Sequence, residues 1–487
     1  FFKQKTAYEI KECDWSSDVC SSDLKLLAMS ATKIKVSLTT LGCSRNEADT
    51  EELAGRLNDD GWELVTDPTE AEVVVINTCG FIESAKKDSI DALIEASTLK
   101  SNGAAKAVVA VGCMAERYGD ELAKALPEAD AILGFDDYND ISNRLRSILD
   151  GHKPAARTPK DRRTIIPIAP VSRQEIRAAM GQGGTFARKR LGNSPLAPLK
   201  IASGCDRRCT FCAIPLFRGA FLSRRPTEII DEARWLSDNG VSEIFLVSEN
   251  TTSYGKDFGD LRVMESLLPE LSKIEGIERI RLSYLQPAEM RPTLLQAMIE
   301  DEKVAPYFDL SFQHSAKDVL RSMRRFGGNE EFLHLISQIR ALSPDAGIRS
   351  NFIVGFPGER ESDFEELCRF VEDAQLDAVG VFGYSDEDGT EALNMANKLD
   401  SETIAHRVSL LSTISDNAVS ERAALRIGAE VEVLIDDPEI QEGRAAFQGP
   451  EVDGTVGFES ETDFKLGQWV KAVIIDSAGA DLIARLL

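Results

Sequence analysis

SGCDRRCTFCAIP, residues 203–215, places three cysteines on one short stretch of chain, at Cys205, Cys209 and Cys212. The spacing is C-x3-C-x2-C, and we refer to these residues as the barrel triad. A tetrahedral zinc site takes four protein ligands, so three thiolates with no fourth nearby fit an iron–sulfur cluster better. A missing thiolate leaves one iron of such a cluster open for chemistry. The alternatives are a zinc knuckle and three unrelated cysteines.

Length and composition indicate a multidomain enzyme. The chain has 487 residues, which exceeds the usual size of one domain. It contains no apolar run long enough to cross a bilayer. Nine cysteines in a chain of this size do not resemble a secreted disulfide framework, so we expect free thiols and a cytoplasmic protein. The net charge of −25 opposes binding to phosphate backbones and favours a basic partner.

Residues 1–28 are set apart from the rest of the chain. The sequence of residues 1–24 has no helical or strand period, and it lacks the apolar core and cleavage site of a signal peptide. It resembles translated sequencing-adapter read-through. We therefore interpret this extension as non-native, with Met29 as the native start, and exclude Cys13 and Cys20 as ligands. The alternative is a disordered tail.

Residues 33–150 alternate between apolar strands and amphipathic helices, which predicts a parallel, doubly wound sheet. Cys43, Cys79 and Cys113 each end a predicted strand and precede a predicted helix; we call them the sheet triad. The carboxyl ends of parallel strands share one edge, so we expect the three thiols to converge there. The alternative is that cysteine is simply a small residue suited to burial.

Residues 197–424 read as six strand–helix units, after a linker at 151–196 that is rich in Pro, Gly and charge. Six units imply a partial (β/α)6 barrel, a variant of the eightfold barrel. Its first predicted strand delivers the barrel triad. This arrangement resembles the signature of the radical S-adenosylmethionine (AdoMet) enzymes, in which AdoMet chelates the open iron through its amino and carboxylate groups.

The chemistry of such barrels lies at the carboxyl ends of the strands. Phe211 is a candidate to pack against the adenine of AdoMet, with ordinary core packing as the alternative. Arg349 is a further candidate, although it starts its strand. No catalytic residue is predicted beyond the cysteines. The remaining candidate contacts to AdoMet follow predicted strands and are Glu249, Gln313, Gly355 and Gly358.

Residues 425–487 form short predicted strands separated by Gly and Asp, which indicates a small β-barrel of a kind that often binds nucleic acid. Eleven acidic residues lie between positions 430 and 465, against only Arg444 and Lys465. A barrel that binds RNA needs a positive surface. We therefore expect a basic protein as its partner.

Three parts in this order resemble the methylthiotransferase family over essentially the whole chain after residue 29, and the C-terminal part resembles its TRAM barrel. The family motifs are LGCSRNEADTEE, NTCGFIESA, VGCMAERYG and SGCDRRCTFCAIPLFRG. One branch of the family modifies an adenosine of transfer RNA, and the other modifies small-subunit ribosomal protein twelve. The stretches VSENTTSYGKD and VFGYSDEDGTEA are similar to the ribosomal-protein branch.

This resemblance implies two 4Fe-4S clusters. The barrel triad would hold the cluster that reduces AdoMet, and the sheet triad would hold a second cluster that presents the sulfur. The implied product is a methylthio group on the β-carbon of an aspartate, with an electron donor such as flavodoxin or ferredoxin. We do not expect nucleic acid as the direct substrate. The alternatives are an enzyme that acts on an isopentenylated adenosine of transfer RNA and a non-catalytic zinc- and RNA-binding module.

Overall fold

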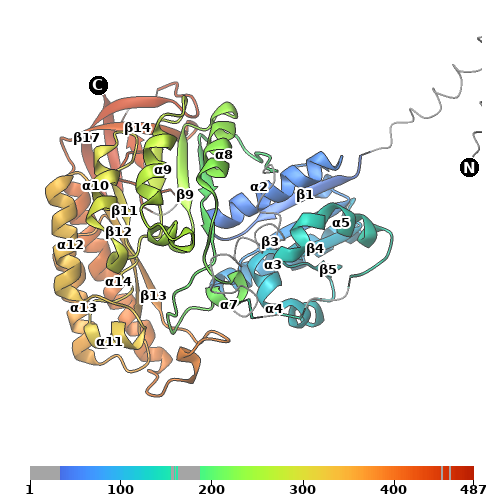
Figure 1. Cartoon of the computed structure of the whole chain (residues 1–487), viewed down its shortest axis with the longest axis horizontal. Helices are drawn as coiled ribbons and strands as arrows, with labels where there is room; N and C mark the ends of the chain where they lie inside the picture. The colour runs from blue at the N-terminus through green and yellow to red at the C-terminus, as the bar shows by residue number, and fades with distance from the viewer. Residues whose placement is uncertain (1–32, 155–157, 160, 163–186, 451–452, 460–461) are drawn as a thin grey trace, which may run out of the picture.

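The computed structural model describes residues 33–154, 158–159, 161–162, 187–450, 453–459 and 462–487. The predictions for the N-terminal extension and for the middle of the linker fall outside these residues. Figure 1 shows the remaining chain as an N-terminal α/β part, a central barrel and a C-terminal set of strands beside the barrel. The predicted α/β class with these three architectures is confirmed.

The N-terminal part is one parallel sheet of five strands in the order β2-β1-β3-β4-β5. The strands are β1 (Lys35–Thr40), β2 (Glu63–Leu64), β3 (Val73–Thr78), β4 (Ala107–Val111) and β5 (Ala131–Ile132). Helices cover both faces, which explains why every residue of β3 and β4 is buried, rather than every second one. The order reverses between β1 and β3, and ligands of doubly wound sheets bind at such a reversal.

Leucines from the helices form one core on each side of this sheet. Helices α2 (Ser44–Asp59) and α5 (Ile141–Leu149) pack on one face, through Leu53 and Leu145 among others. Helices α3 (Glu83–Asn102) and α4 (Gly112–Ala125) pack on the other, through Leu93 and Leu122. The sheet is therefore covered by a packed apolar core on both faces.

The central part contains six parallel strands in two hydrogen-bonded groups, β6-β9-β10 and β11-β12-β13. Bridges at Ile280–Val304 and Leu285–Leu310 connect the groups. The strands are β6 (Leu196–Lys200), β9 (Glu243–Val247), β10 (Arg279–Leu282), β11 (Tyr307–Asp309), β12 (Gly347–Val354) and β13 (Ala378–Gly383). Near the barrel triad, β7 (Ala202–Ser203) pairs with β8 (Leu222–Ser223).

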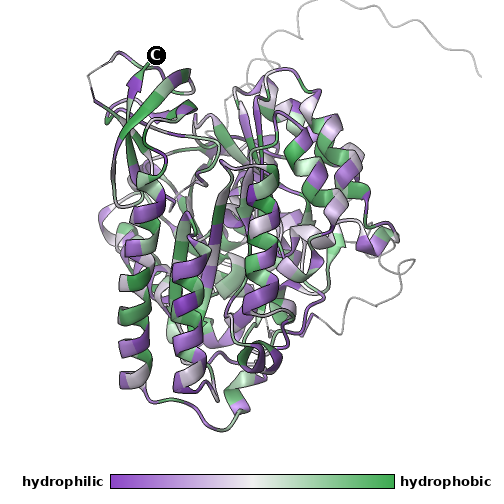
Figure 2. Cartoon of the chain, turned by 90° about the vertical axis from the view of Figure 1, so that its left-hand side faces the viewer, coloured by the Kyte–Doolittle hydropathy of each residue, from purple (hydrophilic) through white to green (hydrophobic). Residues whose placement is uncertain are grey.

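Helices follow these strands and surround a single large apolar core. Hydrophilic and hydrophobic stripes run along the outer helices (Figure 2), as expected for helices that are buried on one face only. The helices are α7 (Ile214–Arg218), α8 (Pro226–Asp238), α9 (Val263–Ser272), α10 (Pro292–Glu300), α11 (Lys317–Ser322), α12 (Asn329–Leu342), α13 (Glu361–Ala374) and α14 (Ser401–Ala424).

The C-terminal part is a closed barrel in the order β14-β15-β16-β18-β17, so it leaves no open sheet edge. Its strands are β14 (Glu430–Asp437), β15 (Glu442–Arg444), β16 (Val456–Phe458), β17 (Trp469–Ala478) and β18 (Asp481–Leu486).

A buried charge cluster joins this small barrel to the amino ends of the central strands. Glu243, the first residue of β9, lies 2.9 Å from Arg281 and 3.4 Å from Arg444 of the small barrel, and all three side chains are buried. Burial alone would raise the pKa of Glu243, but Arg444, Arg281 and Arg279 lower it to about 2. The carboxylate therefore stays ionised at neutral pH, and the small barrel sits at the amino ends, away from the barrel triad.

We predict that Glu243→Gln destabilises the protein by roughly 3–5 kcal/mol, because it leaves the buried Arg281 without its carboxylate. Urea unfolding monitored by tryptophan fluorescence measures the change. The control is Glu278→Gln, since Glu278 forms only an exposed pair with Lys303 at 3.8 Å. We expect that control to cost less than about 1 kcal/mol. Equal effects of the two substitutions would contradict the assignment.

Candidate functional site

The sheet triad lies where three neighbouring strands end. Cys43 directly precedes α2, Cys79 follows β3, and Cys113 is the second residue of α4. Gly42 has φ +92°, and a Cβ there would lie 2.9 Å from the Cys79 sulfur, so the position requires glycine. A Cβ on Gly80 would lie 3.1 Å from the Cys113 carbonyl carbon. The expected convergence of the three strand ends is therefore present in the structure.

The barrel triad lies on the loop between β7 and α7. The Cys205 amide donates to the Gly219 carbonyl at 3.0 Å, and the Cys212 amide donates to the Cys209 carbonyl at 3.1 Å. None of the seven cysteines in the described parts of the chain forms a disulfide. Burial raises the pKa of Cys205 to about 11 and also raises that of Cys212. Such thiols become thiolates readily only beside a cation, and the iron of a cluster is one.

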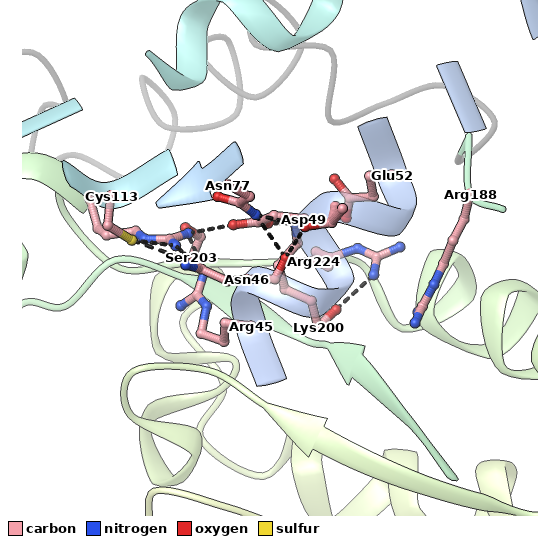
Figure 3. Close-up of polar contacts among 12 residues, drawn as sticks. Arg45, Asn46, Asp49, Glu52, Asn77, Cys113, Arg188, Lys200, Ser203 and Arg224 are labelled. Atoms are coloured by element: carbon pink, nitrogen blue, oxygen red, sulfur yellow. Dashed lines mark hydrogen bonds and ion pairs between the residues drawn. The ribbon is translucent and has the colours of Figure 1, made fainter. Parts of the chain in front are cut away.

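The two triads belong to one site. Cys113 packs in a small buried cluster with Ala213, which directly follows Cys212, and with Phe217. Arg218 ends α7, and its Nη2 atom donates to the Cys113 sulfur at 3.0 Å. Helix α7 therefore begins at one triad and ends at the other. Figure 3 shows Cys113 among the polar contacts at the interface of the sheet and the barrel.

Buried ion pairs hold this interface together. Asp49 of α2 accepts from Arg218 at 3.0 Å and from Lys200 of β6 at 2.7 Å. Arg45, one turn earlier on α2, pairs with Glu249 at the end of β9. Burial raises the pKa of Asp49, but Lys200 and Arg218 outweigh it and hold the pKa below its usual range. The sheet and the barrel are therefore tied by charges that water hardly reaches.

Asn46 connects all three loops of the sheet triad. Its Nδ2 atom donates to the carbonyls of Leu41 at 2.8 Å and Thr78 at 3.3 Å. Its Oδ1 atom lies 3.5 Å from the Cys113 sulfur and accepts from Arg218 at 3.1 Å. The side chain is fully buried. Asn46 therefore positions the thiols without being a ligand candidate itself.

The loop after β13 of the central barrel contacts the helices beside the sheet triad. Glu387, after β13, pairs with Arg117 of α4 at 2.8 Å and with Lys86 of α3 at 2.9 Å. Arg117 also donates to the carbonyl of Gly80 at 3.0 Å. The motif VFGYSDEDGTEA therefore lies beside the residue that follows Cys79.

Some of the predicted AdoMet contacts lie together beside the barrel triad. Phe211 packs against a cluster that includes Phe356, the residue after Gly355. Gly355 and Gly358 have φ values of +77° and +85°, which explains why the loop uses glycine at both positions. The carboxylate of Glu359 accepts from the Gly355 amide at 2.8 Å and so shapes this loop from within.

The three remaining candidate contacts to AdoMet lie in different parts of the central barrel. Gln313 has a left-handed backbone (φ +72°), and its amide donates to the Asn351 carbonyl at 3.0 Å, near the carboxyl end of β12. Glu249 lies at the expected strand end, but its carboxylate is engaged in the interface. Arg349 lies near the amino end of β12, with its Nε atom 3.5 Å from Asp453 of the small barrel. The structure therefore does not bring Arg349 to the barrel triad, and it supports no contact between Arg349 and AdoMet.

Sequence reasoning missed the polar residues that organise the site. Asn46 and Asp49 lie three and six residues after Cys43, and this spacing places them on one side of α2. Arg218 lies six residues after Cys212 within the same motif. A second arginine, Arg325, lies 3.9 Å from the Cys209 sulfur. For Asn46, Asp49 and Arg218, their positions inside the cysteine motifs were the available signal, whereas Arg325 lies outside those motifs.

The donor set fits iron–sulfur clusters better than zinc. Each set offers three thiols, whereas a structural zinc site takes four protein ligands. The two sets of three thiols match clusters that keep one iron open.

The barrel and its three-thiol loop define a radical AdoMet enzyme. Residues 199–371 match the Radical SAM superfamily, residues 35–134 match "Uncharacterized protein family UPF0004", and residues 427–487 match the TRAM domain. This class implies AdoMet and 4Fe-4S clusters as cofactors.

Close relatives then identify the family. The chain is 57% identical to the ribosomal protein uS12 methylthiotransferase RimO of Streptomyces coelicolor, over 93% of this chain and 96% of that protein. It is 56% identical to the RimO protein of Kineococcus radiotolerans, over 94% of this chain and 98% of that protein. The chain belongs to the ribosomal protein uS12 methylthiotransferase family.

A solved structure supports the fold. The radical S-adenosylmethionine methyltransferase TsrM of Kitasatospora setae, solved with cobalamin and a [4Fe-4S] cluster bound, aligns with a TM-score of 0.54 at 13% identity. The alignment covers 74% of this chain and 77% of TsrM. At this identity the likeness concerns the fold alone.

We predict that the thiols of iron-depleted protein differ in reactivity. Cys43 is exposed, whereas Cys79 and Cys113 are buried, and burial raises the pKa of Cys79 to about 11. At about pH 8, iodoacetamide should modify Cys43 at least about tenfold faster than the other two, because the thiolate is the reactive form. Peptide mass spectrometry follows each site, and guanidinium-unfolded protein is the control in which the difference disappears. Equal rates in the folded protein would contradict the described burial.

Proposed function

We propose that the protein adds a methylthio group to the β-carbon of an aspartate in ribosomal protein uS12. The observation that carries this proposal is the meeting of two three-thiol sets at one interface, in a chain that is 57% identical to a uS12 methylthiotransferase. One set alone would suit many radical AdoMet enzymes. The second set supplies a place for the sulfur that the product requires.

In this proposal the barrel triad holds the cluster that binds AdoMet, and the sheet triad holds the second cluster. An aspartate β-carbon has an unactivated C–H bond, so the bound cofactors supply the radical chemistry that side chains cannot. The chain's own part is to hold both loops at a fixed separation and to keep water out. Phe211, Gln313, Gly355 and Gly358 remain candidate contacts to AdoMet.

The proposed partners are uS12, a basic protein, and an electron donor such as flavodoxin or ferredoxin. We also propose a cytoplasmic location, where thiolate ligands stay reduced. Among the described residues, no helix combines the length and apolar character needed to span a membrane. The transfer-RNA enzyme and the zinc-binding module gain no support from the relatives or from the donor set.

The test is anaerobic incubation with uS12, AdoMet and a reductant, followed by mass spectrometry of uS12. We expect one methylthio group on one aspartate. Replacing the barrel triad with Ala should abolish both this product and the cleavage of AdoMet to 5′-deoxyadenosine. Replacing the sheet triad should abolish the product but retain AdoMet cleavage. Methylthiolation by the second variant would refute the assigned roles, and modified transfer RNA in place of uS12 would refute the substrate.

The structure changes which acidic residues could attract a basic partner. Asp436 is occupied by Arg444 at 2.6 Å, and Asp453 is buried. Other acidic side chains of the small barrel are exposed to solvent, including Glu430, Glu439 and Glu459. The small barrel joins the central part at the amino ends of its strands, so these residues would contact the body of the substrate rather than its reactive aspartate.

We predict that Glu430→Lys, Glu439→Lys and Glu459→Lys together weaken binding of uS12, and that added salt weakens binding to the unaltered protein. Exposed charges mainly set association rate and partner choice, and single pairs contribute little. Titrations at two salt concentrations measure this. The matched control is a triple reversal at Glu270, Glu300 and Glu365, exposed residues on helices of the central part. Equal affinities for all three proteins would contradict a role of this barrel in recognition.

A further inference from the structure

We propose that Arg218 is a positioning residue that fixes the Cys113 sulfur and raises the reduction potential of the second cluster. The inference rests on the proposed function only in that the sheet triad holds a cluster. It adds a specific residue, a specific atom and a measurable property to that proposal. Figure 3 shows the labelled residues Cys113, Asn46, Asp49 and Lys200 in this region.

Both terminal nitrogen atoms of the Arg218 guanidinium form hydrogen bonds. Nη2 donates to the Cys113 sulfur at 3.0 Å and to Asn46 Oδ1 at 3.1 Å. Nη1 donates to Asp49 Oδ2 at 3.0 Å. Lys200 holds the other oxygen of that carboxylate at 2.7 Å. The guanidinium plane is therefore fixed on two sides, and its N–H bond to sulfur has little freedom.

Burial strengthens this contact. The Arg218 side chain is only 7% exposed, and the Asp49 side chain is 5% exposed. Interactions between charges in such surroundings are screened far less than at the surface. An arginine stays charged even there, since its guanidinium does not lose a proton in proteins. The sheet triad therefore has a permanent cation bonded to one of its sulfurs.

The chain itself links this cation to the barrel triad. Only five residues separate Cys212 from Arg218, and those nearest Arg218 belong to α7. Proline occupies the second position of this helix and helps to preset its backbone. A short, stiff connection means that Arg218 follows the barrel loop closely. A displacement of the barrel triad would therefore move Arg218 and change its contact with Cys113.

Hydrogen bonds to sulfur are among the main determinants of iron–sulfur reduction potential. Each added electron makes a cluster more negative, and a donor or cation at a ligand sulfur stabilises that state. Arg218 should therefore make the second cluster easier to reduce. An arginine that served only to join the two domains would have no such effect.

Arg188 offers a matched control for this distinction. Its buried guanidinium bridges Glu51 of α2 and Glu232 of α8, each at 2.7 Å, across the same interface. These two partners are carboxylates, not thiols. Arg188→Gln therefore removes an equally buried interdomain arginine without touching a sulfur.

The experiment uses the full chain with the barrel triad replaced by Ala, so that only the second cluster gives a paramagnetic signal on reduction. Redox titrations followed by electron paramagnetic resonance compare this parent with added Arg218→Gln, Arg218→Lys or Arg188→Gln. We expect a lower midpoint potential for Arg218→Gln and a smaller decrease for Arg218→Lys, which keeps the charge. Arg188→Gln should match the parent. Iron content is measured for each protein.

An unchanged midpoint in Arg218→Gln with full iron content would overturn the inference, as would equal decreases in Arg218→Gln and Arg188→Gln. If Arg218→Gln loses iron while Arg188→Gln keeps it, the positioning role is supported and Arg218→Lys decides the effect on potential. Equal loss of iron from both would overturn the positioning role. Absence of iron from the parent would instead refute the proposed function, so the two failures are distinguishable.

Discussion

A buried carboxylate, Asp49, is the constraint on which the site depends. It pairs with both Arg218 and Lys200, and removing it would take the shared carboxylate from two cations of the interface. Breaking a buried ion pair in this way costs roughly 3–5 kcal/mol. The interface therefore has few alternative arrangements. The contact between Asp49 and Arg218 fixes α2 against α7. It therefore also fixes both cysteine loops, because α2 starts directly after Cys43 and α7 ends with Arg218.

Buried ion pairs join a different domain to each end of the central barrel. At the carboxyl ends, charges tie the barrel to the parallel sheet and bring the two triads together. At the amino ends, Glu243 and its arginines tie the barrel to the C-terminal strands. Chemistry and the proposed docking of a basic partner are thereby placed at opposite ends of one rigid core. A long substrate could contact both ends, which suits a protein better than a small molecule.

Much of the fold could be predicted from the sequence, because parallel strands follow a strict rule: their carboxyl ends share an edge. That rule predicted the convergence of Cys43, Cys79 and Cys113 from their places in the chain alone. Strand β2 was missed because two residues carry no detectable period. Arg349 was a candidate although the sequence already placed it at the start of its strand, and its contact with Asp453 of the small barrel joins residues too far apart in sequence to be predicted. The contact between Arg218 and Asn46 joins residues far apart in sequence, so no local pattern could show it.

The central claim is that the two cysteine triads lie at one tightly packed interface, so that the clusters they would hold are close together. The most direct measurement is electron paramagnetic resonance of the reduced protein with both triads intact, compared with the sum of the spectra of the two triad variants. Magnetic interaction between electron spins is strong only at short separation. The account predicts broadened or split signals, or faster spin relaxation, in the intact protein. A spectrum equal to the simple sum, with both clusters fully assembled and reduced, would contradict it.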